Sequence, residues 1–140
     1  AAIEKNGCED KAFCLLNALS NDLQTKLGSD PLSRFIPYVQ MYEFEGLLFS
    51  DPEALAKSID YGLAKRLMGI RDEFNTPEDI NDSPVTAPSK RLKRLYPQYD
   101  KPIHGSLAAL EVGLDIIRQQ CRLFDGWLTK IENLPSLQAG

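Results

Sequence analysis

The sequence contains no long hydrophobic run. No stretch approaches the ~18 uninterrupted apolar residues that cross a bilayer, and the N-terminal residues lack the basic-then-apolar pattern of a targeting signal. We therefore expect no membrane-spanning segment, no membrane partner and a cytoplasmic location.

Cysteine and histidine are also scarce. Cys8, Cys14 and Cys121 are far apart and lack the paired cysteines or clustered histidines of a zinc site, so we expect reduced structural thiols. The single histidine, His104, has no accompanying serine or cysteine nucleophile motif. We interpret it as a helix-start or loop residue; a role as ligand or general base is the alternative.

Charge and length limit the possible classes of protein. A net charge of -4 excludes a chain that coats nucleic acid over its whole surface, but it permits a local basic patch. A length of 140 residues suits one hydrophobic core and is short for two. We therefore expect residues 1–140 to form a single unit.

Apolar residues recur at three- and four-residue steps, which predicts helices over most of the chain. The predicted helices span residues 10–27, 52–59, 61–74 and 89–96, and one long apolar stripe runs from 107 to 131 with a break at Gly126. A capping motif at 76–79 predicts a short turn, and the composition predicts a loop at 81–88 and a loose tail after Leu134.

Only one segment favours a strand. Residues Arg34 to Phe44 are rich in aromatic and branched side chains and include Pro37, which is typical of a strand near an edge. We therefore predict an α/β chain that is predominantly helical, with this one good strand candidate.

Carboxylates gather at the end of the predicted strand. Glu43 and Glu45 would project from the same side of a strand, and Asp51 follows them. Such oxygen ligands suit Mg²⁺ or Mn²⁺, which can activate water for attack on a phosphodiester. In a helix the two glutamates would lie about 200° apart and could not share an ion. A solvated acidic pair is the alternative interpretation.

A basic group follows the predicted loop. Cations alternate here with Tyr96 and Tyr99, an arrangement that can hold phosphates and stack against bases. The solvated basic face of an amphipathic helix would show the same sequence pattern. The candidate nucleic-acid-binding residues are Lys90, Arg91, Lys93, Arg94 and Lys101.

Several distinctive motifs run along the chain: the run from Arg34 to Asp51, Pro77 to Asp82, Ala87 to Arg91, Tyr99 to Lys101, Gly113 and Leu114, Cys121, Phe124, and Trp127 with Leu128. These motifs resemble those of the domain-of-unknown-function 4276 family of uncharacterised bacterial proteins. Tyr42 departs from the histidine that this family more usually has before Glu-Phe-Glu.

The resemblance implies a relation to the Toprim fold, an α/β domain whose acidic residues bind magnesium in primases, topoisomerases and certain nucleases. It also implies a phage-defence setting beside ATPases. This sequence would then be the C-terminal portion of a Toprim-like domain, without the strand and Glu-Gly motif that begin the metal site.

These observations lead to three hypotheses. The first is part of a metal-dependent nuclease or nucleic-acid-processing protein, with Glu43 and Glu45 catalytic, and Glu43, Glu45 and Asp51 near the metal. It would be an enzyme only together with the N-terminal part. The second is a non-catalytic helical interaction module that docks a partner such as an ATPase through the 107–131 stripe. The third is that the motifs only cap and clamp helices.

Overall fold

The computed structural model describes residues 8–80 and 83–135. Contacts divide the chain into two compact units. The terminal unit combines the residues up to Val39 with those from Leu123 onward, and the central unit is Gln40–Arg122. The expectation that residues 1–140 form one unit stays a prediction.

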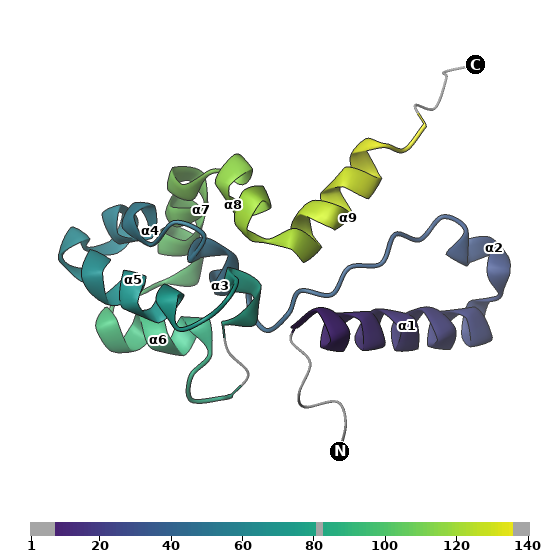
Figure 1. Cartoon of the computed structure of the whole chain (residues 1–140), viewed down its shortest axis with the longest axis horizontal. Helices are drawn as coiled ribbons and strands as arrows, with labels where there is room; N and C mark the ends of the chain where they lie inside the picture. The colour runs from purple at the N-terminus through teal and green to yellow at the C-terminus, as the bar shows by residue number, and fades with distance from the viewer. Residues whose placement is uncertain (1–7, 81–82, 136–140) are drawn as a thin grey trace. The chain divides into compact units, whose positions relative to one another are not determined.

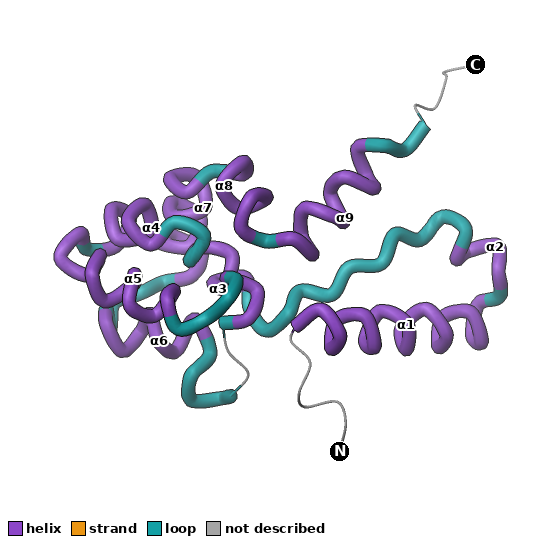
Figure 2. The backbone as a smooth tube through the Cα atoms, in the orientation of Figure 1, coloured by secondary structure: helices purple, strands orange, loops and turns teal. Residues whose placement is uncertain are grey.

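Helices dominate the described residues, of which 71% are helical and none forms a strand (Figure 2). The prediction of an α/β, Toprim-like fold was therefore wrong, and so was the strand at Arg34–Phe44. Residues 35–41 lie outside any regular element, and Phe44 begins helix α3, Phe44–Leu48.

The physical reason lies in the hydrogen bonds that a strand needs. A strand is stabilised by ladder bonds to a neighbour, and the described part of the chain supplies no neighbouring strand. Pro37 has no N–H to donate. Beside it, the Gln40 side-chain amide donates to the carbonyl oxygens of Met41 and Glu43 at 3.4 and 3.3 Å.

The terminal unit contains α1 (Cys8–Leu27), α2 (Ser29–Leu32) and most of α9 (Arg122–Glu132). The predicted helix 10–27 is confirmed, and Gly28, with φ 79°, follows its end. Its expected buried face is only partly covered, because Phe13 and Leu27 are 66% and 58% exposed. Tyr38 stacks on Trp127 with ring centroids 5.0 Å apart.

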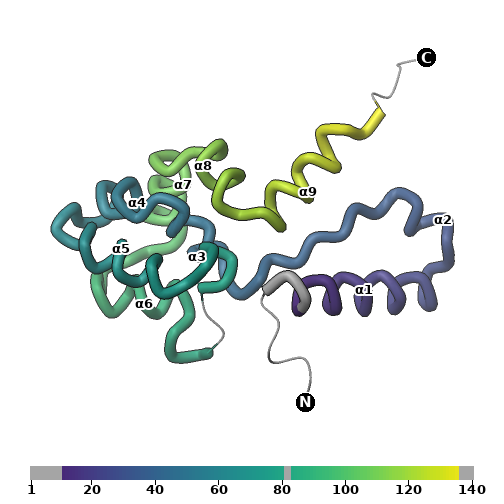
Figure 3. Tube along the Cα trace, in the orientation of Figure 1, coloured from purple at the N-terminus to yellow at the C-terminus, as the bar shows by residue number. Residues whose placement is uncertain are grey.

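The central unit is built around α4 (Pro52–Ile59), which packs against α5 (Ala64–Asp72) and α7 (Ser106–Val112) (Figures 1 and 3). The predicted helix 52–59 is confirmed. Asp51 caps it by accepting hydrogen bonds from the amides of Glu53 and Ala54, both at 3.0 Å. The predicted helix 61–74 is a short turn, η2 (Tyr61–Leu63), followed by α5.

Shorter elements complete the central unit: η3 (Pro77–Asp79), α6 (Pro88–Leu95), η4 (Lys101–Gly105) and α8 (Leu114–Gln120). The predicted capping motif at 76–79 is confirmed by a capping box between Thr76 and Asp79. Of the predicted loop 81–88, residues 81 and 82 lie outside the described residues. The buried core consists of Leu48, Phe49, Leu55, Ala56, Leu67, Ile80, Leu92, Tyr99 and Ala108.

The long stripe from 107 to 131 belongs to α7, α8 and α9 rather than to two helices. The breaks fall at Gly113 and Cys121, whereas Gly126 lies inside α9, so the predicted break was wrong. Gly113 has φ 80°, a conformation that glycine adopts without strain. The predicted loose tail after Leu134 lies largely at 136–140, outside the described residues.

Candidate functional site

Glu43 is the last residue before α3, and its carboxylate reaches α6. Oε2 accepts a hydrogen bond from the Ser89 amide at 2.8 Å, and Oε1 accepts one from the Ser89 hydroxyl at 3.0 Å. Ser89 is in the first turn of α6, where amides have no partner within the helix and negative charge is favourable. Glu43 therefore caps α6 from a distant part of the chain.

Glu45 lies in the first turn of α3 and is 1% exposed. Its Oε2 forms an ion pair with Lys101 Nζ at 3.0 Å. The same ammonium lies 5.8 Å from the centroid of the Phe44 ring. Burial, and next the charge of Glu45, raise the pKa of Tyr99, so its hydroxyl stays neutral beside the carboxylate. Glu45 and Lys101 thereby connect α3 to η4.

The proposed metal pair requires Glu43 and Glu45 to lie on one strand, and the structure does not meet this requirement. Glu43 is extended, but Glu45 is already helical, so the strand condition for a shared ion is not met. Asp51 caps α4. No group of three or more His, Cys, Asp or Glu residues that could hold a metal ion occurs among the described residues. The assignments of catalysis, Mg²⁺ and Mn²⁺ stay predictions.

The predicted basic group separates into two sets. Lys90, Lys93 and Arg94 are exposed on α6 and make no ion pair with any described residue. Arg91 and Lys101 instead form ion pairs within the central unit. Lys101 pairs with Glu45.

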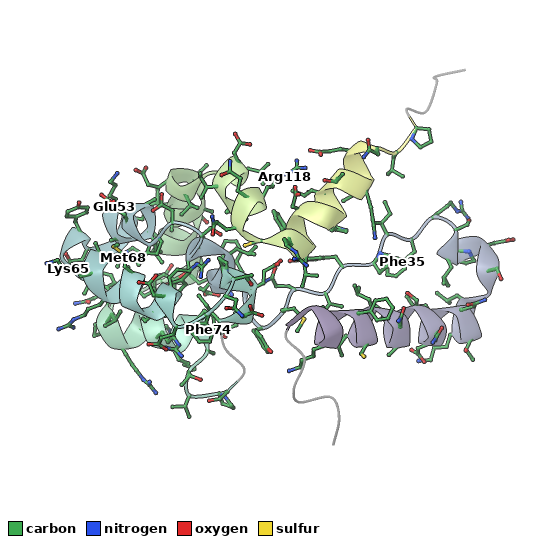
Figure 4. The ribbon with its side chains drawn as sticks, in the orientation of Figure 1. Phe35, Glu53, Lys65, Met68, Phe74 and Arg118 are labelled. Carbon is green, nitrogen blue, oxygen red and sulfur yellow. The ribbon has the colours of Figure 1, made fainter. Side chains whose placement is uncertain are left out.

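Arg91 connects α6 to the chain that precedes and follows η3. Its Nε donates to the Thr86 carbonyl oxygen at 2.7 Å, and its Nη1 lies 3.5 Å from a Glu73 oxygen. Its guanidinium also lies 5.3 Å from the centroid of Phe74, which follows the C-terminal end of α5 (Figure 4). Arg91 therefore makes the internal ion pair expected under the clamping hypothesis.

The aromatic residues near the basic group contact His104. The His104 ring lies 5.4 Å from Tyr96 and 5.9 Å from Tyr99, measured between centroids. Its Nδ1 accepts a hydrogen bond from the Asp100 amide at 2.9 Å. Tyr99 is 4% exposed, so its ring is not available as a platform for bases. Tyr96 is partly buried and packs against the core, so charge is the main means by which α6 would contact nucleic acid.

Cys121 is a buried free thiol 3.3 Å from the Ser50 hydroxyl oxygen. Burial raises the pKa of Cys121 to about 12, so the reactive thiolate is absent near neutral pH. This fits the expected structural role. Cys14 is free and exposed.

An apolar face on η4, α7 and α8 is exposed in the region of the stripe that the second hypothesis proposed as a docking surface. Leu110 is 80% exposed, and Ile103, Leu107 and Leu114 are 60%, 52% and 53% exposed. We name these four residues the leucine face. The side of α7 that is buried carries Ala108 and Val112 instead. Two apolar sets at helical spacing occur on α7, and the larger side chains point outward.

A hollow of about 600 Å³ opens beside this face. It is lined by Phe44, Ser106, Ala109, Leu110, Gly113 and Leu114. Ser106 has the single polar side chain among these lining residues. The arrangement can accept an apolar group, and it offers none of the titratable side chains that acid–base chemistry would use.

The central unit is thus a small helical assembly with an exposed apolar face and no described metal cluster. The model of the family "Domain of unknown function (DUF4276)" matches residues 6–132, and the chain belongs to this family. No curated protein and no solved structure matches the chain. In the described part of the chain, no helix is long and apolar enough to span a membrane.

Proposed function

We propose that the central unit is a protein-docking module that binds an amphipathic helix of a partner protein along the leucine face. The observation that carries this proposal is the exposure of Leu110, 80%, together with its three apolar neighbours in sequence. An ATPase, expected from the family resemblance, is one candidate owner of such a helix.

Burial of this face would be favourable. Fully burying one leucine side chain contributes roughly 1.5–3 kcal/mol. Leu107 and Leu110 lie one turn apart on α7, and Leu114 begins α8 directly after Gly113. A scattered exposed leucine needs no explanation, but consecutive ones beside a hollow are typical of an interaction site.

Charge indicates the chemistry of the partner. Glu111 and Asp115 are exposed on α7 and α8, the helices that carry the three leucines of the leucine face, and neither forms an ion pair with a described residue. The whole chain carries a net charge of -4. Lysine or arginine beside the apolar side of the incoming helix would therefore be favourable.

The same charges disfavour a second copy of this chain as the occupant. A symmetric contact places the same patch of both copies together, so Glu111 and Asp115 would face like charges. Self-association is accordingly an outcome to be measured, and it is not the expected one.

The test uses two labelled helical peptides with identical leucines, one flanked by lysines and the other by glutamates. Fluorescence anisotropy should show that the lysine peptide binds at least ten times more tightly than the glutamate peptide. Leu110→Asp should abolish this binding while thermal unfolding stays unchanged, because the side chain is exposed. Equal binding of both peptides, or binding that survives Leu110→Asp, would contradict the proposal. Sedimentation of the chain alone measures self-association.

A second function, contact with nucleic-acid phosphates, is supported by the exposed cations Lys90, Lys93 and Arg94 on one short helix. Glu43 already accepts a hydrogen bond from the Ser89 amide in the first turn of that helix, so the charges of the three side chains would make the contact. Metal-dependent cleavage remains a separate proposal, tested by whether Mg²⁺ or Mn²⁺ supports cleavage by the longest available form of the protein.

A further inference from the structure

We infer that the hollow beside Phe44 is an anchor pocket for one large, uncharged apolar side chain of the partner helix. This inference rests on the proposed docking function and deepens it, because it specifies the residue at the centre of the recognised segment. Leucine, methionine and phenylalanine are the side chains of this class.

The lining determines the chemistry of the anchor. Phe44, Ala109, Leu110 and Leu114 provide apolar walls, and no titratable side chain lines the hollow. A charged anchor would lose its water without gaining a partner, which is costly. A small anchor such as alanine would contact fewer of these apolar walls than a leucine or phenylalanine side chain.

The Phe44 wall is held in place from behind. Phe44 packs against the buried core, and Lys101 lies over its ring. Gly105 also lies close to the ring, because a Cβ there would be 3.5 Å from Phe44 Cε1, an ordinary contact distance, and a tighter 3.1 Å from the Tyr99 hydroxyl oxygen. A wall held by α3 and η4 is preorganised, so little ordering is needed when the anchor enters.

Gly113 keeps the other end of the hollow open. It separates α7 from α8 with φ 80°, and a Cβ placed there would meet no heavy atom within 4 Å. The chain therefore breaks at Gly113, a residue that lines the hollow, instead of continuing one helix past it. Such a break provides an entry route for a side chain.

The acidic residues lie outside the pocket, and they indicate which charges should flank the anchor on the partner helix. By helical geometry, Glu111 lies about 100° around α7 from Leu110, beyond Leu107. Asp115 follows Leu114 in the first turn of α8. The recognised segment is thus an apolar anchor with lysine or arginine about one helical turn away.

The test varies the central residue of the lysine-flanked peptide among leucine, phenylalanine, alanine and lysine. Leucine and phenylalanine should bind at least ten times more tightly than alanine, and lysine should bind most weakly. In the protein, Ser106→Trp should place a bulky ring in the pocket from an exposed position. It should weaken the leucine and phenylalanine peptides at least tenfold and leave the alanine peptide unchanged.

The matched control is Gln98→Trp, an exposed neutral position that does not line the hollow. It should leave all affinities unchanged, and circular dichroism should give both variants the wild-type melting curve. The leucine peptide could bind in a way that depends on Leu110 while its affinity is unaffected by the anchor residue and by Ser106→Trp. That result would contradict the anchor pocket and leave the docking function standing. If no peptide binds, both fail.

Discussion

Glu43 and Ser89, which lie 46 positions apart, are joined by two hydrogen bonds, one to each carboxylate oxygen. The acidic residue that the sequence suggested for metal catalysis thus holds the start of the helix that carries the basic group. The carboxylate proposed for metal binding therefore positions the helix that carries the cations proposed for phosphate binding.

Replacing Glu43 with glutamine should destabilise the central unit, because an amide cannot accept both hydrogen bonds and loses the favourable charge. We expect a loss of about 1–2 kcal/mol in the free energy of unfolding, measured by urea denaturation. Glu111→Gln is the exposed control and should change little. An equal effect in both variants would show that capping of α6 contributes nothing.

Replacing Lys101 with methionine should leave the buried Glu45 carboxylate without its cation. Because the Lys101 side chain is 55% exposed, solvent screens the pair, and we expect a loss of about 1–3 kcal/mol. The double variant Glu45→Met/Lys101→Met should recover most of this loss, since no charge is then buried. A double variant that is no more stable than Lys101→Met would contradict the account.

Alkaline pH should weaken the fold through Tyr99. Its pKa is raised above the ordinary value of 10.0, so the folded chain keeps a proton that the unfolded chain releases. The contribution is therefore complete below about pH 10 and declines as the pH rises further. Tyr99→Phe should reduce the loss of stability between pH 9 and 11, measured by urea midpoints. An identical pH profile in Tyr99→Phe and wild type would show that Tyr99 does not contribute.

The exposed cations of α6 predict salt-dependent binding of single-stranded DNA. Neutralising Lys90, Lys93 and Arg94 with glutamine should lower affinity and reduce the dependence of log K on log salt by about 2, at roughly 0.7 per contact. Arg91→Gln should instead mainly lower the melting temperature, because this side chain contacts Thr86, Glu73 and Phe74. Wild-type chain that fails to bind DNA at low salt would refute the second function.

Local signals in the sequence predicted local structure well. The start of α4 at Pro52 was predicted, because a capping side chain and a proline in the first turn act within a few residues. Thr76 and Asp79 did the same for η3. Gly28 marked the end of α1 for the same reason.

The errors arose where a residue's state depends on distant contacts. The strand at 34–44 had suitable side chains, but pairing requires a neighbour that no local pattern can supply. On α7, two sets of apolar residues had helical spacing, and tertiary packing selected Ala108 and Val112 for burial. The engagement of Glu43 by Ser89 could not be predicted either, because it joins two separate elements.

The docking function is tested most directly by amide NMR spectra of the ¹⁵N-labelled chain during titration with the lysine-flanked leucine peptide. The account predicts shifts concentrated at Phe44 and residues 103–115, with α6 unchanged, and their loss in Leu110→Asp. Shifts confined to other helices, or no shifts at millimolar peptide, would contradict it.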